Sequence, residues 1–206
     1  MVRPMRRRGI LGGTFNPIHI GHLLAAEEAA TALGLDEVLF MPAGDPWMRA
    51  GERLASKEDR WNMAVLATQT NPRFAPSRLE IDRDGPTYTV DTLAELQAQQ
   101  PAAYWFILGI DALLGLPRWR EPVRLLDLCR IAAVARPGYD ARGALDALSR
   151  ELPGAEKRVD IVEGLEIGVS ATDIRQRVQD GRSIRYRVPD AVERYIIDRG
   201  LYKVSA

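Results

Sequence analysis

The sequence predicts an α/β protein: a parallel β-sheet flanked by helices, with a small helical lobe at the C-terminal end. Short apolar runs alternate with segments of helical periodicity along most of the 206 residues, a pattern typical of parallel sheets with crossover helices. Hydrophobic residues make up 46% of the chain, enough for a substantial core. The length favours a single domain, residues 1–206, in which residues from about 168 onward form the helical lobe.

Six short apolar segments, each bounded by turn residues, are predicted to form the strands of this sheet. The first, Arg8–Gly12, ends in a glycine-rich turn, and the fifth begins at Arg130 and is stopped by Pro137-Gly138. The predicted strands are residues 8–12, 37–42, 73–81, 103–109, 130–136 and 158–164.

Helix start and stop signals accompany the periodic segments between and after these strands. Ser56 followed by Asp59 resembles a capping box, and Ser170 is the predicted N-cap of a helix that ends before Gly181. Pro189 is predicted to start the last helix and Gly200 to stop it. The remaining helices are predicted at about 21–33, from Thr89 to about 100, and near 142–152.

The composition excludes several classes of protein. Lys and Arg together number 28, as do Asp and Glu, so the chain lacks the basic excess of a nucleic-acid-binding protein. The single Cys129 excludes an internal disulfide framework and a cysteine-rich metal site, and we expect it to be a buried thiol. Neither a signal peptide nor an apolar run of about 18 residues is evident. We therefore expect no membrane partner and a cytoplasmic location.

The turn after the first strand contains both histidines of the chain, His19 and His22. At this spacing they share one face of a helix's first turn, and Gly21 between them is expected to let a phosphate or base approach. Gly12-Gly13 lets the backbone come close to a ligand, and the helix N-terminus favours phosphate. Zinc is the rival ligand, but two histidines without a nearby third ligand make a poor zinc site. No metal-ligating residue is therefore assigned.

The segment GGTFNPIHIGH, residues 12–22, resembles the signature of nucleotidyltransferases related to class I aminoacyl-tRNA synthetases, with Asn16 where an Asp is usual. The resemblance implies that His19 and His22 are catalytic and contact the phosphates of ATP. It also implies that the turn preceding them binds ATP, through Gly12, Gly13, Thr14 and Phe15.

A second motif, VSATDIRQRV at residues 169–178, resembles the I-S-S-T-x-I-R motif of the same nucleotidyltransferases. Ser170 and Thr172 stand at a helix N-terminus suited to phosphate oxygens, and Arg175 one turn later can neutralise the leaving pyrophosphate. The alternative is an ordinary capped helix with a solvated arginine. A synthetase would need a Lys-Met-Ser-Lys-Ser-like loop, and Ser56-Lys57 follows the first motif too closely to provide it.

Four further stretches make the resemblance more specific. Residues 42–49, 80–93, 106–126 and 181–196 are similar to the nicotinate-nucleotide adenylyltransferase family, and the similarity extends over essentially the whole chain. This implies a Rossmann-like nucleotidyltransferase fold in a single nucleotidyltransferase domain. The implied reaction transfers the adenylyl group of ATP to nicotinate mononucleotide and gives deamido-NAD and pyrophosphate.

The same resemblance implies two sets of binding residues. Trp119 would stack on the pyridine ring, while Thr89 and the backbone amides near Trp119 and Arg120 would hold the carboxylate. Core packing is the alternative for Trp119, and a strand end with a helix cap for Tyr88 and Thr89. Arg49 aligns with a family cation although its loop lacks the usual histidine, and Arg120 replaces a usual Tyr. Implied for ATP are Gly109, Asp111, Ser170 and Thr172; implied for the nicotinate nucleotide are Arg49, Tyr88, Thr89, Trp119 and Arg120.

The expected mechanism is a direct in-line attack without a covalent intermediate, because the attacking phosphate oxygen is already ionised and needs no general base. Mg²⁺ is expected with ATP, although the sequence shows no dedicated carboxylate cluster for it. Other acceptors stay open (nicotinamide mononucleotide, phosphopantetheine or flavin mononucleotide), as does a non-catalytic nucleotide sensor. The sequence also leaves a homo-oligomer open.

Overall fold

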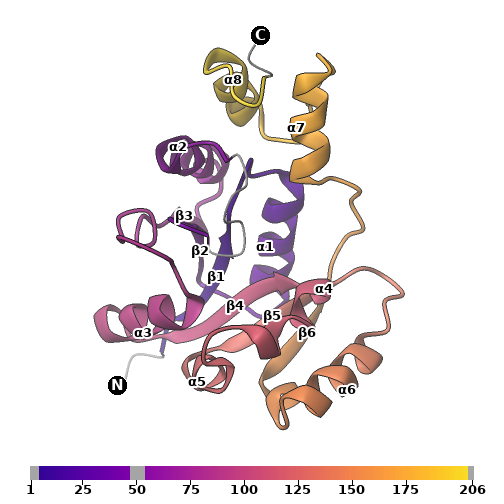
Figure 1. Ribbon diagram of the computed structural model, residues 1–206. Coiled ribbons are helices and arrows are strands. Elements are labelled where there is room, and N and C mark those ends of the chain that lie inside the picture. The colour runs from indigo at the N-terminus through magenta and orange to yellow at the C-terminus, as the bar shows by residue number, and fades with distance from the viewer. Residues whose placement is uncertain (1–4, 47–53, 204–206) are drawn as a thin grey trace. The chain divides into compact units, whose positions relative to one another are not determined.

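The computed structural model describes residues 5–46 and 54–203 (Figure 1). The chain divides into two compact units, each assembled from three separate segments. The first unit comprises residues 1–12, 25–39 and 88–166. The second unit comprises residues 13–24, 40–87 and 167–206.

The strands form a six-stranded sheet in the order β3-β2-β1-β4-β5-β6. Pairing is parallel from β1 through β4 and β5 to β6, and places Ile10 opposite Phe106 and Phe106 opposite Ile131. The order reverses direction between β1 and β4, and open sheets of this kind bind ligands at the carboxyl ends of the strands beside such a reversal. The strands are β1 (Arg7–Gly13), β2 (Glu37–Pro42), β3 (Phe74–Pro76), β4 (Ala103–Gly109), β5 (Arg130–Ala135) and β6 (Val159–Glu163).

In the first unit, helices pack around the buried strands β4 and β5. The helix α3 lies beside α5 (Figure 1). Asp160 of β6 accepts both a bidentate pair of bonds from Arg130 and a bond from the Trp105 indole at 2.8 Å, which links three neighbouring strands. The helices of this unit are α3 (Thr89–Gln99), α4 (Ile110–Leu113), α5 (Pro122–Leu128) and α6 (Ala141–Glu151), with 3₁₀ turns at Leu116–Arg118 and Ala155–Arg158. The helix α1 (Ile20–Ala32) belongs to the second unit up to residue 24 and to the first from residue 25.

The second unit contains α2 (Lys57–Thr68), α7 (Ala171–Gln179) and α8 (Asp190–Asp198). Figure 1 shows α8 near α2, and side chains join them. The Tyr195 hydroxyl donates to Asp59 Oδ1 at 2.8 Å and accepts from Asn62 Nδ2 at 3.0 Å. These two hydrogen bonds hold α8 against α2.

Most predicted elements are confirmed to within a residue or two. Ser56 and Ser170 cap their helices as predicted, each accepting the N–H of the residue three positions on. The prediction of a third strand over residues 73–81 was wrong in length, because the strand ends at Pro76. After Pro76 the chain turns, and the Asp82 N–H donates to Arg78 O at 2.9 Å. The Arg78 guanidinium donates hydrogen bonds to the carboxylates of Asp82 and Glu58.

Two smaller expectations concern burial and membranes. Cys129 is buried as expected, at the end of α5, and burial raises the pKa of its thiol to about 12. Within the described ranges, no helix combines the length and apolar character that crossing a membrane requires. The short helices α4 and α5 were not predicted.

Candidate active site

The glycine-rich turn of the second unit is built around Phe15. Phe15 is buried with a positive φ of 48°, and its ring lies edge-on to His22 with centroids 5.1 Å apart. A Cβ at Gly13 would lie 3.1 Å from the Phe15 ring, so the glycine allows the aromatic side chain to fold back under the turn. The turn is therefore a packed structure that supports the histidine side chain.

The two histidines form a stacked pair. Their ring centroids lie 3.7 Å apart with an interplanar angle of 24°, and the His19 main-chain N–H donates to His22 Nδ1 at 3.1 Å. Because Nδ1 accepts this bond, the proton of neutral His22 lies on Nε2. Burial lowers the pKa of His19 to about 4, and burial together with the charge of His19 lowers the pKa of His22 well below its ordinary value. At neutral pH both rings are uncharged hydrogen-bonding groups.

Gly21 leaves space for the imidazole ring of His19. A Cβ at residue 21 would lie 3.1 Å from His19 Nδ1 and 3.2 Å from its Cε1. We predicted from the sequence that this glycine makes room for a phosphate or a base. The structure supplies a nearer reason, because the imidazole of His19 itself occupies that space.

Asn16 joins the three segments of the second unit. Its Oδ1 accepts hydrogen bonds from Ala55 N–H and from the Tyr202 hydroxyl, both at 3.0 Å. Its main-chain carbonyl accepts from Arg175 Nη1 at 2.8 Å. Because both side-chain partners are donors, an amide oxygen satisfies them as well as a carboxylate would. The replacement of the usual Asp by Asn16 therefore leaves this pair of bonds in place.

The start of α7 presents Ser170, Thr172 and Arg175. The Ser170 hydroxyl accepts the N–H of Asp173 at 3.1 Å, as an ordinary N-cap does, and Thr172 is exposed. Arg175 is not the freely solvated arginine of the alternative reading, since it is held by the Asn16 carbonyl and lies 3.4 Å from Thr172 Oγ1. It also lines a cavity of about 420 Å³ with Ser56, Asp59, Gln179, Tyr202 and Lys203.

Arg60 is a supporting residue that the sequence analysis missed. It is 2% exposed, and its guanidinium donates to Thr14 O at 3.0 Å and to Gly44 O at 2.9 Å. It also donates to the carbonyls of Ala43 and Ala55, and burial lowers its pKa. One buried side chain thus ties the turn after β1 to the loop after β2. Its position in α2 gave no signal, because arginines on amphipathic helices are usually solvated.

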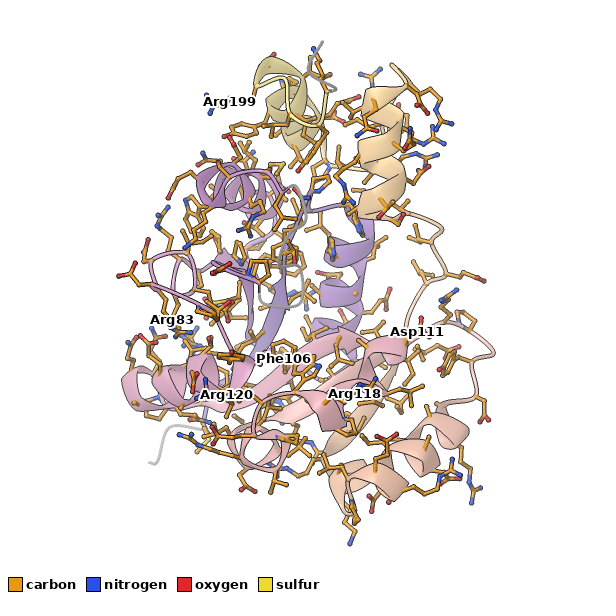
Figure 2. All side chains as sticks on the ribbon, in the orientation of Figure 1. Arg83, Phe106, Asp111, Arg118, Arg120 and Arg199 are labelled. Atoms are coloured by element: carbon orange, nitrogen blue, oxygen red, sulfur yellow. The ribbon has the colours of Figure 1, made fainter. Side chains whose placement is uncertain are left out.

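In the first unit, Gly12, Phe106 and Trp119 form a packed column. A Cβ at Gly12 would lie 3.0 Å from the Phe106 ring, and the half-buried Trp119 stands edge-on to Phe106 at 5.6 Å. Figure 2 shows Phe106 on β4. The core-packing alternative for Trp119 thus describes the Phe106 side of its ring, while the rest of the indole stays partly exposed.

Of Tyr88, Thr89 and Arg120, the side chains of Tyr88 and Arg120 are in contact. Tyr88 is the last residue before α3 and Thr89 is its first. The Arg120 guanidinium lies over the Tyr88 ring at 4.6 Å, a distance suited to a cation–π interaction. It also lies 3.6 Å from Asp91 and 3.7 Å from Glu121, with half of the side chain exposed. A cation is therefore available beside these residues.

Gly109 and Asp111 stand at the carboxyl end of β4. Gly109 is exposed, with open space where its Cβ would lie. The exposed Asp111 is ion-paired with Arg136 at 3.0 Å, and Arg136 lies 3.9 Å from Glu166. Arg136 follows β5 and was missed, because the predicted strand over residues 130–136 included it.

The predicted site residues thus fall into two groups. His19, His22, Ser170, Thr172 and Arg175 lie in the second unit with Gly13, Thr14 and Phe15, whereas Gly12, Tyr88, Thr89, Gly109, Asp111, Trp119 and Arg120 lie in the first. Arg49 and the neighbouring Trp47 and Met48 lie outside the described residues. In the part of the chain that the structure describes, no group of three or more His, Cys, Asp or Glu side chains is arranged to hold a metal ion.

Comparison with known proteins points to one group of enzymes. Residues 10–177 match the cytidylyltransferase-like family. A relative from Roseiflexus sp. (strain RS-1) is 51% identical over 195 residues, covering 95% of this chain and 97% of its own. One from Corynebacterium jeikeium (strain K411) is 45% identical over 200 residues, covering 95% of this chain and all of its own. Both are named as probable nicotinate-nucleotide adenylyltransferases.

The fold also matches solved structures. The nicotinic acid mononucleotide adenylyltransferase of Plasmodium falciparum, in complex with NaAD, superposes with a TM-score of 0.77 at 18% identity. The match covers 96% of this chain and 97% of that one. At this identity the likeness is one of fold, and it confirms the predicted nucleotidyltransferase architecture.

Proposed function

Because the chain belongs to the nicotinate-nucleotide adenylyltransferase family within the cytidylyltransferase-like proteins, we propose that it transfers the adenylyl group of ATP to nicotinate mononucleotide. The products are deamido-NAD and pyrophosphate, and the location is the cytoplasm. The observation that carries the proposal is the histidine pair. Two neutral, stacked imidazoles at a glycine-rich turn suit contact with phosphate oxygens better than acid–base work at neutral pH.

The reaction is a single in-line displacement. A phosphate oxygen of nicotinate mononucleotide attacks the α-phosphorus of ATP and forms a new phosphorus–oxygen bond. The bond from the α-phosphorus to the oxygen bridging it to the β-phosphate breaks, and pyrophosphate leaves with that electron pair. No proton must be removed from the nucleophile, so the protein's work is alignment and charge stabilisation.

We propose that the candidate catalytic residues divide this work as follows. The lowered pKa values of His19 and His22 make them neutral hydrogen-bonding groups, and His22 offers Nε2–H. The positive charge for the leaving pyrophosphate then comes from Arg175, whose guanidinium keeps further N–H groups after bonding Asn16. Ser170, Thr172 and the amides at the start of α7 supply additional donors.

Mg²⁺ is proposed to accompany ATP, where it would neutralise part of the charge on the phosphates. Gly109 and Asp111 are proposed to serve the ATP side of the site.

Nicotinate recognition is proposed for Trp119, Tyr88, Thr89, Arg49 and Arg120. The exposed part of the Trp119 ring would stack on the pyridine, which is worth about 0.5–1.5 kcal/mol beyond area burial. The Arg120 guanidinium, held over Tyr88, adds a cation that attracts a carboxylate but not a neutral amide. This goes further than the sequence analysis, in which residue 120 acted through its backbone amide.

The deciding experiment measures pyrophosphate release by the purified protein with ATP, Mg²⁺ and either nicotinate or nicotinamide mononucleotide. We expect strong preference for the nicotinate form, and the His19→Ala variant should remain folded while losing the activity. Equal or reversed preference would keep adenylyl transfer but overturn the account of the acceptor. Turnover only with phosphopantetheine or flavin mononucleotide would assign another acceptor, and ATP binding without turnover would identify a nucleotide sensor.

A further inference from the structure

We propose that Tyr202, near the C-terminal end of the chain, is a positioning residue for catalysis: its hydroxyl fixes Asn16, and Asn16 in turn holds Arg175 in the orientation that receives the leaving pyrophosphate. This inference rests on the proposed adenylyl transfer. It assigns a role to a residue that lies outside both phosphate-binding motifs.

The first step of the argument is the contact itself. The Tyr202 hydroxyl donates to Asn16 Oδ1 at 3.0 Å, and Ala55 N–H donates to the same oxygen at 3.0 Å. Two donors from different segments hold this amide oxygen, and burial raises the pKa of the Tyr202 phenol so that it keeps its proton. The Asn16 side chain therefore has one orientation, in which Tyr202 provides one of two supports.

The second step is the passage from Asn16 to Arg175. Nη1 of Arg175 donates to the main-chain carbonyl of Asn16 at 2.8 Å. A guanidinium is planar and its five N–H groups form a rigid fork, so fixing one N–H fixes the direction of the others. The carbonyl two residues earlier, Thr14 O, is held by Arg60 at 3.0 Å. With the Asn16 side chain clamped, the carbonyl that orients Arg175 has a defined place.

The third step is the unusual backbone near the chain end. Gly200 and Tyr202 both have positive φ values, 61° and 65°. Glycine adopts this conformation readily, but a tyrosine does so rarely and against steric strain. Such strain persists where surrounding contacts outweigh it and is concentrated at functional sites. At Tyr202, the contact that offsets this strain is the hydrogen bond from the phenol to Asn16 Oδ1.

The test is a double-mutant cycle with a matched control. Tyr202→Phe removes only the hydroxyl, and we expect kcat for pyrophosphate release to fall about ten- to hundredfold with little change in KM for the acceptor. In an Arg175→Lys background, which lacks the fork, the same change should have less than about a twofold further effect. The control, Tyr195→Phe, removes a phenol that bonds Asp59 in the same unit and should lower stability while leaving kcat within about twofold.

Several outcomes would overturn the assignment. These are an unchanged kcat for Tyr202→Phe, an equal loss for Tyr195→Phe, or a full Tyr202→Phe effect in the Arg175→Lys background. If Tyr202→Phe does not fold, the comparison passes to residue 16: Asn16→Asp keeps the acceptor and should retain far more activity than Asn16→Leu. Equal activities of those two variants would refute the role. If the wild type accepts a different nucleotide, the proposed function fails, and the cycle is run with that nucleotide.

Discussion

The main-chain N–H of His19 donates to Nδ1 of His22 across 3.1 Å, while the two rings stack 3.7 Å apart. Because the donor belongs to the backbone, the position of one ring is set by the turn that carries the other. His22 is further held edge-on by Phe15. The pair therefore behaves as one preorganised unit, which is the condition under which hydrogen-bond donors contribute most to a transition state.

Gly21→Ala should damage catalysis through His19. The new methyl group would meet the His19 ring at 3.1 Å, so the imidazole must move, and we expect kcat to fall by about 10²-fold. The measurement is steady-state pyrophosphate release together with the unfolding temperature. Gly168→Ala is the control, since open space surrounds its Cβ position. Wild-type kcat in Gly21→Ala would show that the ring position does not matter.

Stability should depend on pH through the histidines. Their folded pKa values lie below the ordinary value of 6.5, to about 4 for His19, so the unfolded chain binds more protons in this range. Their contribution to the free energy of unfolding is complete above about pH 6.5 and is lost as the pH falls towards 4. Urea unfolding across this window should show declining free energy. A His19→Asn, His22→Asn variant should flatten the decline, and an unaltered slope would contradict the assignment.

Arg120→Gln should weaken selection for the acid. Loss of the cation over Tyr88 removes the attraction for a carboxylate, and kcat/KM for nicotinate mononucleotide should fall about tenfold, equivalent to ~1.4 kcal/mol. The value for nicotinamide mononucleotide should not fall. Arg124→Gln is the control, because Arg124 is an exposed cation paired with Glu121 at 3.0 Å. Parallel losses with both nucleotides would mean that Arg120 has a structural role only.

Arg60→Met should destabilise the second unit. Four main-chain carbonyls lose their buried donor, and since each unpaired carbonyl costs about 1–3 kcal/mol, the free energy of unfolding should fall by about 3 kcal/mol or more. Arg182→Met, at an exposed arginine paired with Asp180, should change it by less than about 0.5 kcal/mol. Chemical denaturation of both variants measures the difference, and similar small changes would deny Arg60 its supporting role.

The sequence predicted those features that depend on neighbouring residues. The caps Ser56 and Ser170 were predictable because an N-cap bond spans only three residues, and the buried strands because their apolar runs are continuous. Asn16 and Tyr202 lie 186 positions apart, and no local pattern reports such a contact. Arg60 was missed for a different reason, since only the folded chain brings four carbonyls around a side chain that looks solvated. The predicted third strand was too long, because the chain turns after Pro76 and Arg78 pairs with Glu58 and Asp82 there.

The division of the second unit among three chain segments has a consequence for biosynthesis. The turn at residues 13–24 is translated well before Arg175 and Tyr202, which belong to residues 167–206. The nascent protein must therefore keep its glycine-rich turn without its partners until translation has nearly reached residue 202. Any premature stop that removes Tyr202 would release a chain whose Asn16 lacks one of its two supports.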